Sequence, residues 1–408
     1  MTHRFGVLRR FRFNLPQRIA GGLLAAFLLQ GLWVTTHQTL TDRDYQYARC
    51  GRETWERPSA LAGYYTTCGN IHDGILAYRV AGFPLTVNFL GERFLDLFRK
   101  PEDRVVQPAG AGATGPEVST WELRHQMTHI LLLLRLPFLL AGCVLGGCVW
   151  WVSRRLYGNW GGYMALSLFC FCPAILRACL SPNPEMLAAL GVYGGVYTAI
   201  GVAHAMQGPR RKWRPRIVLL IAVMGIAAAA HIAALPVAAL LGLAAMLWIA
   251  EGRRSQALPL ELMASIGAVA LVFACYGFSP DAFSYVFRSS AGFLWFSRDP
   301  AVRFFSSLPE VGIAIAAAAA VALYLSIRRS RYFGNTAPML CALVCMALVM
   351  TGSPGSPWLW SLPFLFTFIG GVFADAFESP YGRVALASAG AIVVLQAALS
   401  VTSLSGMM

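Results

Sequence analysis

The sequence predicts an all-α integral membrane protein with about eleven transmembrane helices and one long loop outside the cytoplasm. Of the 408 residues, 57% are hydrophobic and only 13% are charged, and the mean hydropathy is +0.57. Soluble domains usually carry about 25% charged residues, so this composition excludes a soluble fold. Apolar segments close to the roughly 20 residues that a bilayer requires alternate with short basic turns, and this alternation predicts the helices.

The beginning of the chain predicts a cytoplasmic N-terminus followed by an uncleaved membrane helix. Residues 1–18 contain five arginines, one histidine and no acid, a composition that stays in the cytoplasm. Residues 19–37 are then the first transmembrane helix. The sequence Thr35-Thr36-His37-Gln38 is not a small-residue cleavage site, so the helix is not expected to be removed as a signal peptide.

Residues 38–128 form the one long polar region, which is too charged for the bilayer and is expected to be extracytoplasmic. Helices are expected at the membrane surface over residues 41–56 and 84–98, with a third that begins near Trp121 and continues into the next span. The tract 107–120, rich in Ala and Gly, is expected to be a loop. The second helix has an apolar face suited to lying on a membrane, formed by Leu85, Phe89, Phe94, Leu95 and Phe98.

The rest of the chain, residues 129–408, is expected to be a domain of membrane helices. Spans are expected near residues 129–152, 160–180, 185–206, 216–234, 236–250, 258–278, 311–327, 337–352, 357–375 and 384–404. The arginine-rich turns fall on the same side as the N-terminus, which supports the count. These turns contain Arg154-Arg155, residues 210–216, Arg253-Arg254 and residues 328–331.

The net charge of +14 and the ten cysteines do not indicate a nucleic-acid or zinc protein. The basic residues fall in short clusters between apolar segments, which membrane topology explains better than nucleic-acid binding. No Cys-x-x-Cys pair is present, and eight cysteines lie in apolar segments as packing residues. Cys50 and Cys68 both lie in the first outer loop, and an oxidising compartment would allow them to pair.

Several motifs occur in a fixed order along the chain. Arg135-Leu136-Pro137 begins the second span, Arg154-Arg155-Leu156-Tyr157-Gly158 ends it, and Pro182-Asn183-Pro184-Glu185 opens the fourth. This order resembles the membrane core of the GT-C glycosyltransferases. Residues 225–245 resemble the paired fifth and sixth spans of the class, with His231 where a lysine is common, and residues 356–378 resemble a late span. The likeness covers most of residues 18–375 and includes family 39 protein O-mannosyltransferases and lipid A aminoarabinose transferases.

The resemblance implies a GT-C-like fold in the inner (plasma) membrane and transfer of a sugar from a polyprenyl-phosphate donor. The acceptor would be a lipid, glycan or protein on the extracytoplasmic face, and displacement at the anomeric carbon would invert its configuration. The class places a catalytic aspartate in an Asp-Glu pair before a Tyr-Ala helix. Alignment on Tyr47-Ala48 puts Asp44 second in that pair and Arg43 first, so the acidic motif is displaced.

Asp44 is therefore the expected general base, with Asp42 as the alternative catalytic residue. A structural interpretation competes for each residue, because Asp is strongly favoured as a helix N-cap. Glu185 has two interpretations as well: a second acid that binds substrate, or a carboxylate stabilised by the helix dipole. His231 is expected within a span, where it would either contribute to function or donate a hydrogen bond to a neighbouring helix.

Cationic side chains on the outer side are candidates to bind the donor phosphate. Each of them is alternatively an interfacial arginine that reaches for lipid headgroups. A divalent metal is the one cofactor that the sequence suggests, held by Asp44, His72 and Asp73, although Asp73-Gly74 is also a common turn. The candidate arginines are Arg49, Arg52, Arg79, Arg124, Arg288, Arg298 and Arg303.

A second function class is a non-enzymatic multi-pass membrane protein, either a transporter or a degenerate relative that handles lipid-linked sugars without transferring them. A transporter is expected to place ionisable groups at mid-bilayer depth and to show paired interrupted helices. Here charge within the predicted spans is nearly absent and the acids collect at one surface, which favours surface chemistry. The displaced acidic pair and the histidine at position 231, where the class commonly has a lysine, leave the degenerate relative open as an alternative.

Overall fold

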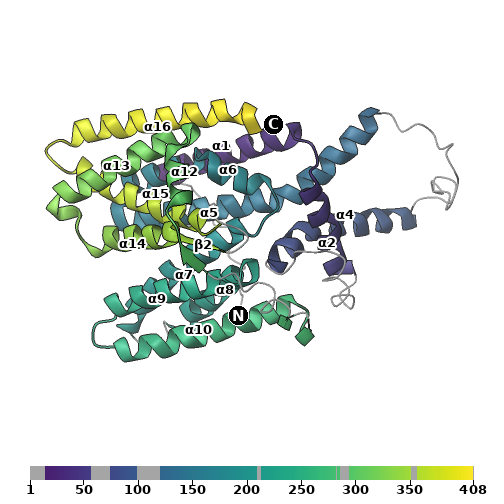
Figure 1. Ribbon diagram of the computed structural model, residues 1–408, viewed down its shortest axis with the longest axis horizontal. Helices are drawn as coiled ribbons and strands as arrows, with labels where there is room; N and C mark the ends of the chain where they lie inside the picture. The colour runs from purple at the N-terminus through teal and green to yellow at the C-terminus, as the bar shows by residue number, and fades with distance from the viewer. Residues whose placement is uncertain are drawn as a thin grey trace, which may run out of the picture.

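A computed structural model describes residues 14–56, 74–98, 120–208, 213–281, 283–284, 294–350 and 356–407. These residues are almost entirely helical, as their composition predicts (Figure 1). The α-helices in chain order are α1 (Leu15–His37), α2 (Asp42–Glu56), α4 (Ile75–Phe98), α5 (Thr120–Cys170), α6 (Pro173–Leu180), α7 (Glu185–Met206), α8 (Arg214–Ala230), α9 (Ala234–Ile249), α10 (Arg254–Cys275), α12 (Asp299–Ser306), α13 (Val311–Ser326), α14 (Phe333–Ala347), α15 (Ser356–Phe377) and α16 (Gly382–Leu404).

Seven helices among the described residues are long and apolar enough to cross a membrane, so the chain is a multi-pass membrane protein by this criterion. They are α1, α5, α7, α10, α13, α15 and α16. The remaining predicted spans coincide with shorter elements: the second half of α5 with α6, then α8, α9 and α14. The helices α8, α9 and α14 have 17, 16 and 15 residues, respectively.

Helix α5 contains two of the predicted spans in succession. Its 51 residues change direction at Gly158, where φ is 76° and ψ is −172°. Residues other than glycine rarely adopt this positive φ, so the glycine permits the sharp change of direction. The second of these spans then breaks before Pro173, which begins α6.

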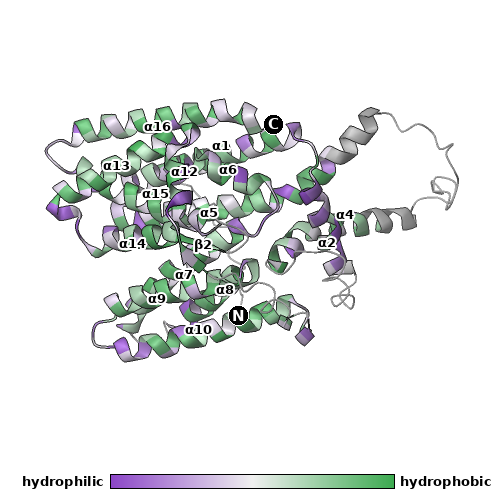
Figure 2. Ribbon diagram, viewed as in Figure 1, coloured by the Kyte–Doolittle hydropathy of each residue, from purple (hydrophilic) through white to green (hydrophobic). Residues whose placement is uncertain are grey.

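The membrane helices run side by side in Figure 1, with α16 along one edge and α10 along the other. The turns that follow α9, α13 and α15 lie together at the left end of the view, whereas α2 and α4 lie at the right. Hydrophilic residues gather in those turns and in α2, and hydrophobic residues dominate the long helices (Figure 2). One end of the bundle therefore carries the hydrophilic turns after α9, α13 and α15, and the other carries α2 and α4.

Helices α2 and α4 pack closely against each other at the right end of the bundle. A Cβ added at Gly82 would lie 2.1 Å from the backbone carbon of Gly51, so the two backbones touch at these glycines. The ring of Tyr47 also stacks on that of Tyr78 with 4.0 Å between centroids. This pair of helices, residues 42–56 and 75–98, is called the α2–α4 platform below.

The second surface helix differs from its prediction. It begins at Ile75 rather than Pro84, and Pro84 lies inside the helix. Of the predicted apolar face, Leu85 is buried and Phe94 is exposed, so these two do not share one exposed face; the side chains of Leu95 and Phe98 lie outside the described residues. The exposed apolar face of α4 is formed instead by Phe83, Val87, Leu90 and Phe94, which recur every three or four residues.

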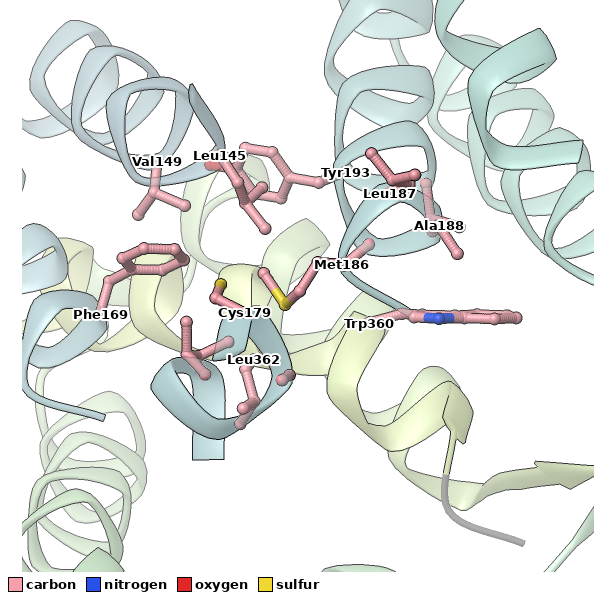
Figure 3. Close-up of a cluster of buried hydrophobic side chains, with 14 of the residues drawn as sticks. Leu145, Val149, Phe169, Cys179, Met186, Leu187, Ala188, Tyr193, Trp360 and Leu362 are labelled. Atoms are coloured by element: carbon pink, nitrogen blue, oxygen red, sulfur yellow. The ribbon is translucent and has the colours of Figure 1, made fainter. Parts of the chain in front are cut away.

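The core lies where α5, α6, α7 and α15 meet. Figure 3 shows side chains from all four helices close to one another, among them Leu145, Cys179, Met186 and Leu362, whereas the Trp360 indole extends to one side. The all-α prediction is corrected in one detail: Leu294–Phe296 and Leu348–Met350 form a short antiparallel pair, β1 with β2. The predicted span 337–352 therefore ends in a strand, because α14 stops at Ala347.

Candidate functional site

Asp44 lies at the start of α2 and accepts hydrogen bonds from the residue that caps the helix. Asp44 Oδ2 accepts from the Thr41 backbone N–H at 3.1 Å and from the Thr41 hydroxyl at 2.7 Å. The Asp44 N–H in turn donates to Thr41 Oγ1 at 3.2 Å. Thr41 and Asp44 thus form a reciprocal capping box, in which threonine is the N-cap. Asp42, the first residue of the helix, is exposed.

Asp44 also forms a buried ion pair with Arg135 of α5. Arg135 Nη2 lies 2.5 Å from Asp44 Oδ2, and Arg135 Nε donates to Oδ1 at 3.3 Å. The two side chains are 3% and 1% exposed. Arg135 Nη1 donates to Gln38 at the end of α1. Asp44 therefore joins the α2–α4 platform to the membrane helices through both of its oxygens.

Glu185 begins α7 and meets α15 at the same end of the bundle. Its Oε2 accepts a hydrogen bond from the Trp360 indole N–H at 3.3 Å, and its own N–H donates to Asn183 Oδ1 at 3.1 Å. The Glu185 side chain is half-buried, whereas Trp360 is fully buried. Figure 3 shows Trp360 beside the first turn of α7. The carboxylate is thus held at the bundle end while part of it remains accessible.

His231 lies at the turn between α8 and α9, so its predicted position within a span is wrong. Helix α8 ends at Ala230, and His231 adopts an extended conformation there. Its ring is 5.9 Å from that of Trp360, with an angle of 63° between the planes. The apolar run 225–245 is therefore a pair of helices with a histidine at its tip, next to the indole that contacts Glu185.

The platform covers this group of residues from the side. Gly74, just before α4, has a φ of +93°, and a Cβ there would lie 2.8 Å from the Ala230 carbonyl oxygen. Arg43 of α2 lies over the Tyr47 ring, 5.8 Å from its centroid. Burial raises the pKa of the Tyr47 phenol; the Arg43 cation opposes this rise and the negative charge of Glu185 adds to it. Tyr47 and Glu185 are therefore within electrostatic reach of each other.

The predicted phosphate-binding arginines do not converge on one point. Arg49 forms an ion pair with Glu53, with 3.5 Å between Nε and Oε1. The guanidinium carbon of Arg52 lies 4.7 Å from the centroid of the Phe89 ring. Arg79 donates to the Cys275 carbonyl at 2.7 Å and lies over the Trp55 ring, which links the platform to α10. Arg298 and Arg303 are exposed on or beside the short helix α12. Arg288 and the side chain of Arg124 lie outside the described residues.

The metal prediction is not tested, because His72 and Asp73 lie outside the described residues. Within the residues that are described, no group of three or more His, Cys, Asp or Glu side chains could hold a metal ion. Cys50 is disulfide-bonded, and its predicted partner Cys68 also lies outside the described residues. The eight other described cysteines are free thiols, as expected for packing residues.

An apolar cavity of about 620 Å³ opens between α13, α14 and α15. Alanines of α13 form one wall, and Leu365 and Phe368 of α15 form another. At one side it is lined by Phe305, whose neighbour Phe304 packs on Trp358 with 4.8 Å between ring centroids. The α15 side chains that line the cavity, Leu365 and Phe368, lie five and eight residues after Trp360, so the cavity lies further along α15 than the Glu185 group.

The sequence predicts Asp44 and Glu185 as site residues and leaves two interpretations open for His231, but it does not predict their contacts. Trp360 and Arg135 lie far from them in the chain, and no local spacing points to either contact. No known protein family, curated protein or solved structure matches this chain.

Proposed function

We propose that the chain is a GT-C-like membrane glycosyltransferase that moves a sugar from a polyprenyl-phosphate donor to an acceptor hydroxyl at the end of the bundle covered by the α2–α4 platform. One observation carries this proposal: the half-buried carboxylate of Glu185 meets Trp360 and the His231 turn there, in a bundle that also contains an apolar cavity between α13, α14 and α15. Such a site combines an acid for proton transfer with an apolar surface for a lipid substrate.

Charge distribution supports an extracytoplasmic position for this end. The turns with Arg253-Arg254 and with residues 328–331 lie at the opposite end, and basic turns favour the cytoplasm (Figure 1). The disulfide-bonded Cys50 belongs to the platform, and disulfides persist in oxidising compartments. We therefore orient the platform outward in the inner (plasma) membrane, with about eleven helices crossing the bilayer.

The apolar cavity supports a lipid-linked donor. Its volume of about 620 Å³ and its alanine, leucine and phenylalanine lining suit a segment of prenyl chain. Arg303 is exposed on α12, the helix that also supplies Phe305 to the cavity. An arginine in that position can bind the donor phosphate by charge-assisted hydrogen bonds, and Arg298 extends the same cationic surface.

In the proposed reaction a carboxylate accepts the proton of the acceptor hydroxyl while the acceptor oxygen attacks the anomeric carbon. The bond from that carbon to the phosphate oxygen breaks, polyprenyl phosphate leaves with the electron pair, and the configuration inverts. A base must lie within hydrogen-bond reach of the hydroxyl. Asp44 already accepts four hydrogen bonds and is buried, so the geometry favours Glu185 as the base and Asp44 as a positioning residue.

The proposal is tested with the full-length protein in lipid vesicles supplied with polyprenyl-phosphate hexoses and pentoses and a membrane extract as acceptor source. Release of free polyprenyl phosphate is measured. Glu185→Gln is expected to lower the rate by about 100-fold or more, because a general base typically contributes that much. Glu53 of the platform is partly exposed and distant in sequence from the Glu185 group, so Glu53→Gln is the matched control and is expected to retain activity.

Two outcomes would overturn parts of the assignment. If Glu185→Gln transfers sugar at the wild-type rate, Glu185 is not the base and Asp44 is the remaining candidate. Wild-type transfer by the double variant Asp42→Asn, Asp44→Asn would exclude both aspartates. Absence of transfer with every donor class would refute the enzyme itself.

A non-enzymatic transporter is the second candidate, and one residue favours it. Glu261 is buried in α10, one of the helices able to cross a membrane. The expectation of almost no acid within the spans overlooked this glutamate. Transporters place ionisable groups inside the bilayer. Uptake or export of a lipid-linked sugar without release of polyprenyl phosphate would favour this candidate.

A further inference from the structure

Glu261 belongs to α10, the helix along the lower edge of Figure 1, whereas Glu185 begins α7. Glu261 lies in the second turn of α10 and is 3% exposed. Neither Oε1 nor Oε2 has a hydrogen-bond partner. A buried polar group without a partner is rare in folded proteins, and inside a membrane helix it points to a function.

The carboxyl group faces α9 and α7. A Cβ added at Gly242 would lie 3.1 Å from Glu261 Oε1 and 3.3 Å from Ala199 Cβ, so the acid sits against the α9 backbone. The surrounding cluster is apolar, with Met206, Met246 and Ala264 among its buried members. Gly242 leaves room for a carboxyl group but supplies no side chain that could neutralise it.

Among the residues that the structure describes, none of the charged groups on the neighbouring elements pairs with Glu261. Arg216 of α8 donates to the Gly201 carbonyl, and Arg253, before α10, donates to the Met206 carbonyl. The other described ionisable groups at this end of α7 to α10 are exposed: His204, Arg214, Glu251 and Arg254. The negative charge of an ionised Glu261 would therefore remain uncompensated in apolar surroundings.

We propose that Glu261 is a proton-binding site within the membrane, occupied as a neutral carboxylic acid while α10 packs against α7 and α9. The proton comes from water and returns to it when the contact between α9 and α10 opens. Protonation is thereby coupled to the packing of α10, independently of whether the Glu185 group transfers a sugar.

Infrared spectroscopy tests this proposal directly. The full-length protein is prepared in vesicles with carboxyl-¹³C glutamate, and the isotope-shifted carbonyl band of a protonated acid is recorded at neutral pH. Wild type is expected to show the band, and Glu261→Gln is expected to lose the part of it that comes from position 261. Glu310→Gln is the matched control, because Glu310 is equally buried but accepts from the Ala174 N–H at 2.8 Å and lies 3.7 Å from Arg177. Loss of the band in Glu310→Gln alone, or only ionised bands in wild type, would overturn the proposal.

Thermal stability gives a second measurement on the same variants. A group that must be protonated to fold favours the folded state at low pH, and that advantage is lost as the pH rises above the ordinary pKa of glutamate. The melting temperature of wild type is therefore expected to fall relative to Glu261→Gln between about pH 5 and about pH 9. A difference that does not change with pH would contradict a bound proton.

Discussion

Asp44 and Glu261 are equally buried, yet their surroundings are opposite. Asp44, 1% exposed, accepts four hydrogen bonds, two of them from Arg135. Glu261, 3% exposed, accepts none. Burial alone therefore does not assign a role to a carboxylate in this molecule. The partners do: Asp44 fixes the α2–α4 platform on the bundle, whereas Glu261 is left to exchange a proton.

The largest expected loss of stability follows from removing the charge of Asp44. Asp44→Asn removes the charge that compensates Arg135 and leaves a buried guanidinium unpaired. The expected loss of stability is about 3–5 kcal/mol, the usual cost of removing one partner of a buried pair. Thermal unfolding in detergent, followed by circular dichroism, measures it.

A double variant separates the positioning role of Asp44 from catalysis. Asp44→Asn combined with Arg135→Gln leaves no buried charge, so most of the lost stability is expected to return. Transfer activity that returns with stability would support a positioning role. A stable double variant without activity would instead favour Asp44 as the base. An Asp44→Asn single variant as stable as wild type would show that the ion pair contributes little.

A smaller effect is expected where the platform helices touch. Gly82→Ala places a Cβ 2.1 Å from the Gly51 carbonyl carbon, and a backbone atom cannot move aside as a flexible side chain can. The helices must separate, at an expected cost of about 1–3 kcal/mol. Gly91→Ala is the matched control in the same helix, because nothing lies within 4 Å of its added Cβ. It is expected to stabilise the protein by about 0.5–1 kcal/mol, since alanine favours a helix interior.

The local features of this fold could be predicted from the sequence, whereas its long-range contacts could not. Apolar length and arginine placement predicted the helices, and the run 41–56 is confirmed as α2. The contact between Asp44 and Arg135 joins residues 91 positions apart, and no periodicity encodes it. The start of α4 was misplaced because Pro84 was expected to begin a helix, although this helix tolerates proline in its interior.

The sequence around His231 and Glu261 contains signals that would have improved the prediction of both residues. His231 was expected within a span. Its polar imidazole instead follows the last residue of α8, and Leu235-Pro236 lies in the first turn of α9. Glu261 is a single acid in the sequence LPLELMASIG, inside a predicted span, and the apolar residues around it could have identified it. Its lack of a partner, however, depends on Gly242 and Ala199, which belong to other helices.

The Glu185 side chain is expected to matter little for stability. In Glu185→Gln the amide oxygen can still accept the Trp360 indole N–H, so the expected change in unfolding free energy is below about 1 kcal/mol. Glu185→Ala leaves that buried indole N–H without this acceptor and is expected to cost about 1–3 kcal/mol. A large loss of stability in Glu185→Gln would identify the carboxylate as structural and weaken its proposed role as the base.

The smallest effect is expected from the exposed ion pair on the platform. Arg49 and Glu53 lie 3.5 Å apart on one face of α2, but their side chains are 54% and 36% exposed, so water and salt screen their attraction. A double-mutant cycle with Arg49→Ala and Glu53→Ala is expected to give a coupling energy of about 0.5 kcal/mol or less. The same cycle on Asp44 and Arg135 should give several times more. Because added salt reaches only the exposed pair, the coupling between Arg49 and Glu53 is expected to vanish at high ionic strength, whereas that between Asp44 and Arg135 persists.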